Sequence, residues 1–414
     1  MIHRSVREWE SISFGTQDHE IPEAAAIQLH RAALASNLDA SGRDALHLGR
    51  TSLSARQTVG VVATPEASLE ILPKIDNMAS GGLREQLIHM LSIAYELPIS
   101  LSGESSLGVQ HKSLLDVLIH QFSEQLQSTI KRGLPHRYRL HQDDLPMLRG
   151  KMLHTRQFSA LAAKPDRLAC EFDEFSADTP LNQIMKAAVR SLFAVTKREI
   201  NLRLLRELIV QYVEVSEVHP SHLPWSEVKL DRTNQSWHCL FNFAHLLLNR
   251  RFQNTTSGSS RGVALLFEMN DLFEAYIGKL VKRELAGSGY QAVAQGGLKY
   301  CLQDQHSLRG AFQTKPDILI RKEGEVVAII DTKWKRYRVE EKEASQADVY
   351  QMMAYAQVYQ CPKVILLYPH GEGSSTRAGI QRNFRVAQSN AEIVTATVEL
   401  MGLNTKVVQH LALS

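Results

Sequence analysis

The chain has 414 residues, with 47 Lys and Arg against 44 Asp and Glu, and its formal net charge is only +3. At about 150 residues per domain, this length predicts two or three domains. Hydrophobic residues make up 44% of the chain, and Gly and Pro are near average use, which excludes disordered and collagen-like proteins. The charge also excludes a strongly basic protein of the histone or ribosomal kind, so any surface for a polyanion has to be local.

The N-terminal residues and the cysteines indicate the cellular compartment in which the protein is expected. Residues 1–15 contain no apolar core and no small-residue cleavage site, and no stretch approaches 18 apolar residues. We therefore expect neither a secretory signal nor a membrane span. Cys170, Cys239, Cys301 and Cys361 form no CxxC or CxxH pair, which predicts four reduced cysteines in a cytoplasmic protein and no zinc or iron–sulfur site.

Breaks in the hydrophobic pattern suggest three parts. Residues 254–262 read NTTSGSSRG and carry no large apolar side chain, and residues 102–108 form a weaker break of the same kind. We predict a mixed α+β chain. It consists of a β-rich part at 1–110, a mostly helical part at 111–255 and a C-terminal α/β part at 256–414.

The first two parts contain three readable patterns. Residues 58–63 and 68–72 flank a turn at Thr64-Pro65-Glu66-Ala67, which predicts a β-hairpin. Residues 83–97 have helical spacing of their apolar side chains, and so do residues 181–195.

The last 150 residues alternate helical and strand patterns. The expected order is helix, three strands, helix and strand, or αβββαβ, with further strands after it. The expected helices are residues 265–285 and 344–360, and the expected strands are 290–295, 311–320, 326–332, 363–369, 384–387 and 393–398.

Two acidic residues lie at the ends of apolar runs on consecutive predicted strands. Asp317 belongs to the sequence Lys315-Pro316-Asp317, and Asp331 follows the apolar run at 326–330 and precedes Thr332-Lys333. A carboxylate at the end of a buried strand is costly unless it is paired or binds a metal. Asp331 and Lys333 have i, i+2 spacing and point to the same face of a strand. If the two strands pair, Asp317 joins them there.

Two carboxylates and one ammonium suit metal-assisted phosphodiester hydrolysis. Mg²⁺ is held in proteins by one or two carboxylates together with water and substrate phosphate. We predict Asp317 and Asp331 as metal ligands and Lys333 as the third catalytic group, which orients or deprotonates water or neutralises the transition state. The alternative is coincidence, because these short motifs occur by chance and a strand-end Asp is often a turn residue.

Neighbouring helices supply further candidates. Glu274 borders the apolar stripe of the helix before the strands, so it can face the site. Gln351 and Tyr355 are i, i+4 neighbours on the following helix and share a face, from which they can reach the phosphate or orient Lys333. The alternative for this helix is an ordinary amphipathic element in which Tyr355 belongs to the core.

A basic segment follows the second acidic residue. Four cations and two aromatic residues occupy positions 333–338, a composition that suits the backbone of DNA. The predicted DNA-binding side chains are Trp334, Lys335, Arg336 and Arg338. Because residues 340–343 read EEKE, a mixed, solvated loop is the alternative.

Taken together, these features resemble the McrC family, the nuclease subunit of McrBC-type 5-methylcytosine-dependent restriction systems, whose catalytic domain belongs to the PD-(D/E)xK superfamily. The likeness extends over nearly the whole chain. It is carried by residues 59–61, 69–75, 132–134, 145–151, 171–176, 179–182, 272–274, 315–317, 331–334 and 348–352.

The resemblance implies a division of labour between two proteins. It implies a partner, an McrB-like AAA+ GTPase ring that binds GTP and recognises modified double-stranded DNA. The N-terminal part of this chain would dock in the ring and stimulate GTP hydrolysis. The C-terminal restriction-endonuclease-like domain would cut DNA in phage defence, with Mg²⁺ and with Asp317, Asp331 and Lys333 as its catalytic core and Glu274 and Gln351 as additions.

The chain departs from the family and from nucleotide-binding proteins at two places. Residues 103–108 resemble a phosphate-binding loop, but Val109 and Gln110 stand where such a loop needs Lys and Ser or Thr. The helical middle is longer than in a compact family member. This departure leaves open whether the partner is an ordinary McrB and whether methylcytosine is the modification that triggers the system. Two other functions stay open: a non-cleaving adaptor that activates the GTPase, and a stand-alone RecB-like repair exonuclease, with which Gln351 and Tyr355 are also compatible.

Overall fold

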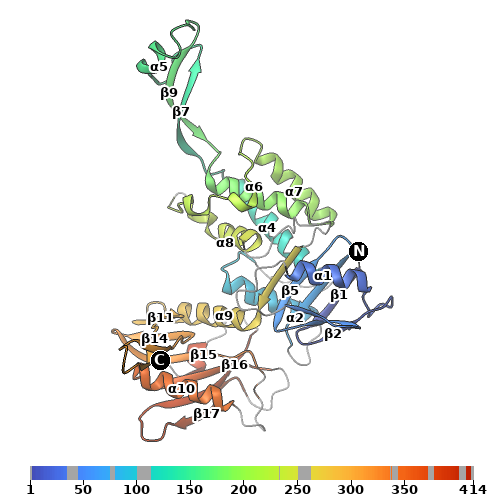
Figure 1. Cartoon of the computed structure of the whole chain (residues 1–414), viewed down its shortest axis with the longest axis vertical. Coiled ribbons are helices and arrows are strands. Elements are labelled where there is room, and N and C mark those ends of the chain that lie inside the picture. The colour runs from blue at the N-terminus through green and yellow to red at the C-terminus, as the bar shows by residue number, and fades with distance from the viewer. Residues whose placement is uncertain are drawn as a thin grey trace. The chain divides into compact units, whose positions relative to one another are not determined.

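The computed structural model contains both helices and sheets, which confirms a mixed α+β chain (Figure 1). It divides into two compact units, one made of Met1–Val117 with Asn249–Ser414 and the other of Leu118–Leu248. No helix in the described part of the chain is long and apolar enough to cross a membrane. The residues described are 2–34, 45–74, 80–99, 113–232, 234–249, 263–335, 337, 344–371, 377–400 and 407–411.

A four-stranded sheet, in the order β1-β6-β5-β10, forms the N-terminal part of the first unit. The predicted hairpin is confirmed, since β5 (Thr58–Ala63) and β6 (Ala67–Leu72) are antiparallel and fully buried. β1 (Ile2–Arg7) pairs in parallel with β6, and helix α1 (Glu23–Leu34) packs its alanine-rich face on the same core. A small sheet of β2 (Ser11–Ser13), β4 (Ser52–Ala55) and β3 (Leu46–Leu48) completes this part.

The fourth strand corrects the sequence prediction. Val263–Glu268 forms β10, where a helix was predicted from residue 265, and it pairs antiparallel with β5. A short, continuously apolar run is compatible with a buried strand and with a buried helix, and pairing with β5 decides between them. A side chain at Gly60 would meet the backbone oxygen of Leu265 at 2.0 Å, so glycine permits this approach. The predicted boundaries at 254–262 and 102–108 lie outside the described residues.

Two helices connect this sheet to the C-terminal sheet. α2 (Ser80–Ala94) corresponds to the helix expected at 83–97, and it packs against α9 (Met269–Glu284). A buried ion pair anchors α2 to the N-terminal sheet, since Arg84 Nε donates to Glu70 Oε1 at 2.7 Å.

The C-terminal sheet has six strands in the order β11-β14-β15-β16-β18-β17. Along the chain α9 is followed by β11, β14, β15, helix α10 and β16, with a separate ribbon, β12–β13, inserted between β11 and β14. The strand predicted at 311–320 is therefore two strands. They are separated at Thr314–Asp317, where Pro316 cannot donate a ladder hydrogen bond. The bounds are β11 Tyr290–Ala294, β12 Tyr300–Gln303, β13 Gly310–Gln313, β14 Ile318–Lys322, β15 Glu325–Thr332, α10 Gln346–Tyr359, β16 Lys363–Pro369, β17 Gly379–Arg385 and β18 Glu392–Val398, with α11 at Val407–His410.

The second unit has more helix than strand, and its strands were not predicted from the sequence. It contains a three-stranded antiparallel sheet, the hairpin sheet, made of β7 (Arg137–Leu145), β8 (Lys151–Met152) and β9 (Leu168–Ser176). Most side chains of β7 lie partly or fully in solvent, so its sequence has no alternating apolar pattern. The helices are α4 Leu114–Ile130, α5 His154–Phe158, α6 Pro180–Phe193, α7 Glu199–Gln211 and α8 His238–Asn249, with 3-10 turns at Pro220–His222, Trp225–Glu227 and Gln235–Trp237.

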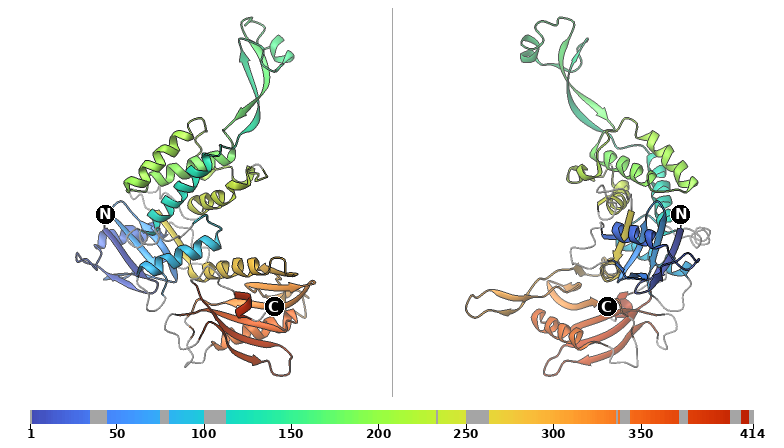
Figure 2. Two further views of the ribbon diagram at one scale, coloured as in Figure 1. Left: turned by 180° about the vertical axis from the view of Figure 1, so that it is seen from behind. Right: turned by 45° about the vertical axis from the view of Figure 1, so that its right-hand side comes forward.

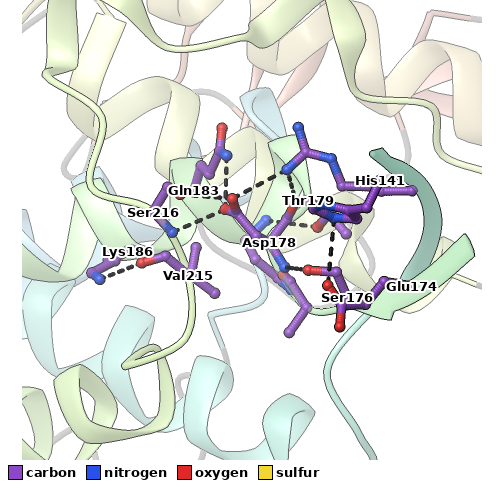
Figure 3. A network of polar contacts seen from close by, with 12 residues as sticks. His141, Glu174, Ser176, Asp178, Thr179, Gln183, Lys186, Val215 and Ser216 are labelled. Carbon is purple, nitrogen blue, oxygen red and sulfur yellow. Dashed lines mark hydrogen bonds and ion pairs between the residues drawn. The ribbon is translucent and has the colours of Figure 1, made fainter. Parts of the chain in front are cut away.

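A polar network centred on Asp178 joins the hairpin sheet to α6 within this unit (Figure 3). Asp178 Oδ1 accepts hydrogen bonds from Gln183 Nε2 at 2.8 Å and from Ser216 N at 2.9 Å. Its Oδ2 accepts from Ser216 Oγ at 2.6 Å and from Arg139 Nη1 at 3.2 Å. The carboxylate thus connects β7, α6 and the segment after α7.

Candidate active site

Strands β14 and β15 bring Asp317 and Asp331 to the same end of one antiparallel pair. Ile318 pairs with Ile330, so Asp317 immediately precedes this pair on one strand and Asp331 immediately follows it on the other. The pairing on which the predicted juxtaposition depended is therefore present. Asp331 is only 1% exposed, which makes it one of the most deeply buried charged residues described.

Thr332 holds the Asp317 carboxylate against β15. Both its backbone N–H and its hydroxyl donate to Asp317 Oδ2, each at 2.7 Å. Sequence reasoning did not select Thr332; its position between Asp331 and Lys333 was the only available signal.

Lys333 lies between the carboxylates and helix α10. Its Nζ is 2.7 Å from Asp331 Oδ2, and it donates to Gln351 Oε1 at 3.3 Å. Gln351 Nε2 donates to the Tyr355 hydroxyl at 2.7 Å, and this hydroxyl donates to the backbone oxygen of Lys315 at 3.2 Å. The structure thus brings the predicted pair on α10 to Lys333. Tyr355 is also a buried core residue, so both interpretations of this helix hold for that side chain.

Glu274 reaches the same place from α9. Its Oε1 accepts a hydrogen bond from Gln295 Nε2 at 2.9 Å, and the backbone N–H of Gln295 donates to the oxygen of Asp317 at 2.8 Å. Burial and the nearby Asp317 carboxylate raise the pKa of Glu274 to about 7. Gln295, which carries this connection, gave no signal in the sequence.

The electrostatics of the cluster are dominated by desolvated carboxylates. Burial and then Asp317 raise the pKa of Asp331 to about 6, and burial raises the pKa of Asp317 despite its bonds from Thr332. Burial acts to lower the pKa of Lys333, but the surrounding carboxylates, Asp331 first, raise it above its ordinary value. One ammonium therefore faces more negative charge than it neutralises, which is a favourable setting for a further cation.

The carboxylate oxygens of this cluster are ligands of the kind that hard cations prefer. Within the described ranges, no group of three or more His, Cys, Asp and Glu side chains is placed to hold a metal ion. Two carboxylates, Asp317 and Asp331, could hold one, and a pair of oxygen donors completed by water and phosphate is what Mg²⁺ accepts.

The side chain of Trp334, a predicted DNA contact, is buried inside the protein. Its Nε1 donates to Glu8 Oε1 at 2.6 Å, and its ring packs against Phe273 at 5.4 Å between centroids. An indole held in this way cannot stack on a base. Glu8 lies at the end of β1, 326 residues away in sequence, so no local pattern could indicate the contact.

The rest of the basic segment is only partly described. Lys335 is exposed, with its Nζ 3.3 Å from Asp348 Oδ2, whereas Arg336 and Arg338 lie outside the described residues. Asp348 also lies 4.0 Å from Lys333 Nζ through its Oδ1. Its backbone N–H donates to Ser345 Oγ at the start of α10, which fixes it beside both lysines. Sequence reasoning did not select Asp348 as a site residue.

The family model described as "McrBC 5-methylcytosine restriction system component" matches residues 53–369. The chain belongs to the McrBC family. The matched segment of this McrBC component contains every residue of the cluster, from Glu274 to Tyr355. No curated protein matches the chain.

Two solved structures share the fold of this McrBC component. One is a chain from a half-complex of the tetradecameric assembly of Thermococcus gammatolerans McrB AAA+ hexamers with bound McrC. It has 21% sequence identity and a TM-score of 0.72, and the match covers 99% of this chain and 98% of that one. The other belongs to the Thermococcus gammatolerans McrBC complex, with 23% identity, a TM-score of 0.54 and coverage of 68% and 88%. At these identities the likeness concerns the fold.

Proposed function

We propose that this McrBC component is the Mg²⁺-dependent DNA endonuclease subunit of a modification-dependent restriction system. The observation that carries the proposal is the meeting of Asp317 and Asp331 at one end of paired strands, with Lys333 Nζ 2.7 Å from Asp331 Oδ2. The order α9, β11, β14, β15, α10 and β16 supports a PD-(D/E)xK domain around this cluster.

Each residue then has a separate task. Asp317 and Asp331 would hold Mg²⁺, which when bound supplies Lewis acidity and a more acidic water. Lys333 neutralises charge that develops on the phosphate, and Gln351 keeps its ammonium in place through the 3.3 Å hydrogen bond. Burial and Asp331 raise the pKa of Tyr355, so its hydroxyl stays protonated and donates to Lys315.

We expect this subunit to act with an McrB-like AAA+ GTPase, and two observations support such a partner. The chain has the fold of a chain from an assembly of AAA+ hexamers with bound McrC, and its sequence has no complete phosphate-binding loop. The hairpin sheet of the second unit (Figure 1) suits a partner. It and the α5 segment between its strands have large apolar side chains that are exposed. These are Tyr138, Leu140, Met147, Leu148, Phe158 and Phe175.

We therefore propose residues 137–176 as the docking element, whereas the family resemblance implied residues 1–110. In the described N-terminal part, most large apolar side chains belong to a buried core. Met147→Ser with Phe158→Ser should therefore abolish stimulation of the partner's GTP turnover without lowering the melting temperature. Trp9→Ser, which alters an exposed side chain of the N-terminal part, is the matched control.

The nuclease proposal is tested by cleavage of methylated and unmethylated plasmid with Mg²⁺ and GTP, with and without the AAA+ partner. Asp331→Ala and Lys333→Ala should abolish cleavage and leave stimulated GTP turnover intact. Normal cutting by either variant would overturn the site. GTPase stimulation without any cutting by the wild type would indicate a non-cleaving activator, and degradation of DNA ends without GTP would indicate a RecB-like exonuclease.

A further inference from the structure

The ribbon formed by β12 and β13, residues 300–313, stands apart from the six-stranded sheet of its own unit (Figure 2, right, orange). Its two strands pair with each other, Tyr300 opposite Gln313 and Leu302 opposite Ala311. Leu302, Leu308 and Phe312 are 59%, 70% and 76% exposed. An isolated two-stranded ribbon is only marginally stable, and large exposed apolar side chains do not stabilise it. These side chains therefore suit a binding partner better than the fold.

The base of the ribbon is held firmly by α10. The Tyr359 hydroxyl donates to the oxygen of Gly297 at 2.7 Å and lies 2.8 Å from Thr314 Oγ1. Thr314 Oγ1 in turn donates to the oxygen of Lys299 at 2.7 Å, which closes the ribbon. Since α10 also carries Gln351 and Tyr355, the ribbon and the candidate active site are positioned by one helix.

Hydrogen bonds close the turn of the ribbon, and two of its exposed apolar residues have an unusual backbone conformation. The Asp304 carboxylate accepts hydrogen bonds from the backbone N–H groups of His306 at 3.0 Å and Ser307 at 2.6 Å. Leu308 and Phe312 adopt the left-handed backbone region, with φ of +55° and +56°. This conformation is disfavoured for residues that carry a side chain, and strain of this kind is concentrated at functional sites.

The charges of the ribbon and its base favour a polyanion. The charged residues between Gln295 and Asp317 are Lys299, Arg309 and Lys315 against Asp304 alone. Asp304 keeps its negative charge within the turn, so the three cations and one carboxylate of the ribbon and its base give a net charge of +2. Phe312 is five residues before Asp317, at most about 17 Å along an extended chain. The ribbon is therefore within reach of a duplex held at the active site.

We propose that the β12–β13 ribbon is a DNA-contacting arm that holds double-stranded DNA beside Asp317 and Asp331. The inference rests on the proposed nuclease function. The major groove of B-DNA is about 12 Å wide and admits a two-stranded ribbon. Leu308 and Phe312 contact base edges in the groove, and Arg309 pairs with a phosphate.

The test uses the full chain and a fluorescent 30-base-pair duplex, with Ca²⁺ in place of Mg²⁺ to prevent cutting. Leu308→Gly and Phe312→Gly remove the side chains while suiting the left-handed backbone, so the fold is retained. Together they should weaken duplex binding about tenfold and raise KM for cleavage with little change in kcat. Arg309→Gln should reduce the salt dependence of binding by about one phosphate contact.

Phe384→Gly, at the exposed β17 edge of the six-stranded sheet, is the matched control and should bind DNA as the wild type does. Unchanged duplex affinity in the ribbon variants of a wild type that cuts DNA would overturn the arm and leave the nuclease in place. A change in sedimentation without a change in affinity would show instead that the ribbon joins two copies of the chain. A wild type that neither binds nor cuts any duplex would overturn the proposed function itself.

Discussion

Asp178 in the second unit and Asp331 in the six-stranded sheet are two enclosed carboxylates with opposite electrostatics. Burial acts to raise the pKa of Asp178, but hydrogen bonds from Ser216 and Gln183, with the charge of Arg139, lower it overall. At Asp331, burial and the Asp317 carboxylate raise the pKa to about 6 despite the nearby Lys333.

The difference lies in the partners that each carboxylate has. Asp178 accepts four hydrogen bonds, from one guanidinium and three neutral donors, so its charge is satisfied and its role is to connect β7, α6 and the segment after α7 (Figure 3). Asp331 faces a second carboxylate and shares one ammonium with it. A satisfied carboxylate stabilises the fold, whereas an under-compensated pair is suited to bind a cation.

The largest expected effect separates the two aspartates by activity. Asp331→Asn should reduce DNA cleavage at least about 1000-fold, because the proposed metal site loses one of its two carboxylates. Its melting temperature should stay the same or rise, because the repulsion from Asp317 is removed. Cleavage kinetics and thermal melts of the same preparation check both parts, and a strong loss of stability would make Asp331 a structural residue like Asp178.

Asp178→Ala should have the reverse signature. Loss of its hydrogen bonds should lower the free energy of unfolding by about 2 kcal/mol. Denaturant unfolding measures this change, with Asp166→Ala as the control, because the Asp166 side chain is 78% exposed and should be dispensable. If both variants unfold alike, the network at the base of the hairpin sheet contributes nothing.

Trp334→Phe sharpens the same distinction for a predicted DNA contact. Removing the indole N–H leaves the buried Glu8 carboxylate with one donor fewer, which should cost about 1.5 kcal/mol of stability. Duplex affinity should not change, whereas Lys335→Gln, at an exposed position, should lower it slightly. Weaker DNA binding by Trp334→Phe at unchanged stability would restore the DNA-contacting role.

Mg²⁺ should stabilise the wild type by an amount set by occupancy. At a free concentration ten times the dissociation constant, the gain is about 1.4 kcal/mol. Calorimetric melts with and without Mg²⁺ should show this gain in the wild type and lose it in Asp331→Asn. An equal gain in both proteins would place the metal elsewhere.

The smallest effect is a pH dependence of opposite sign at the two places. The pKa values of Asp331 and Glu274 are raised to about 6 and about 7, so the folded state holds protons that the unfolded state has lost. Their contribution to stability therefore falls as the pH rises from about 4 to about 7, whereas that of Asp178 is lost below about pH 4. The melting temperature of Asp331→Asn relative to the wild type should accordingly increase over the first range. A constant difference would contradict the raised pKa.

The features that could be predicted from the sequence are those that depend on residues close together in the chain. The i, i+2 spacing of Asp331 and Lys333 and the i, i+4 spacing of Gln351 and Tyr355 are short-range facts. The strand and the helix that carry them were recognisable from their own residues. The apolar runs of β5, β6, β15 and β16 were equally clear, because each strand is buried and has little choice of structure.

The remaining features depend on partners that are distant in sequence. The pairing of β10 with β5 and the contact of Trp334 with Glu8 join segments about 200 and 326 residues apart, which no local periodicity records. The strands of the hairpin sheet were not predicted, because they carry polar side chains on both faces and so lack an alternating apolar pattern. The sequence by itself therefore determined the set of candidate site residues. Only the tertiary structure decided which of them face one another, because burial and charge are properties of the assembled cluster.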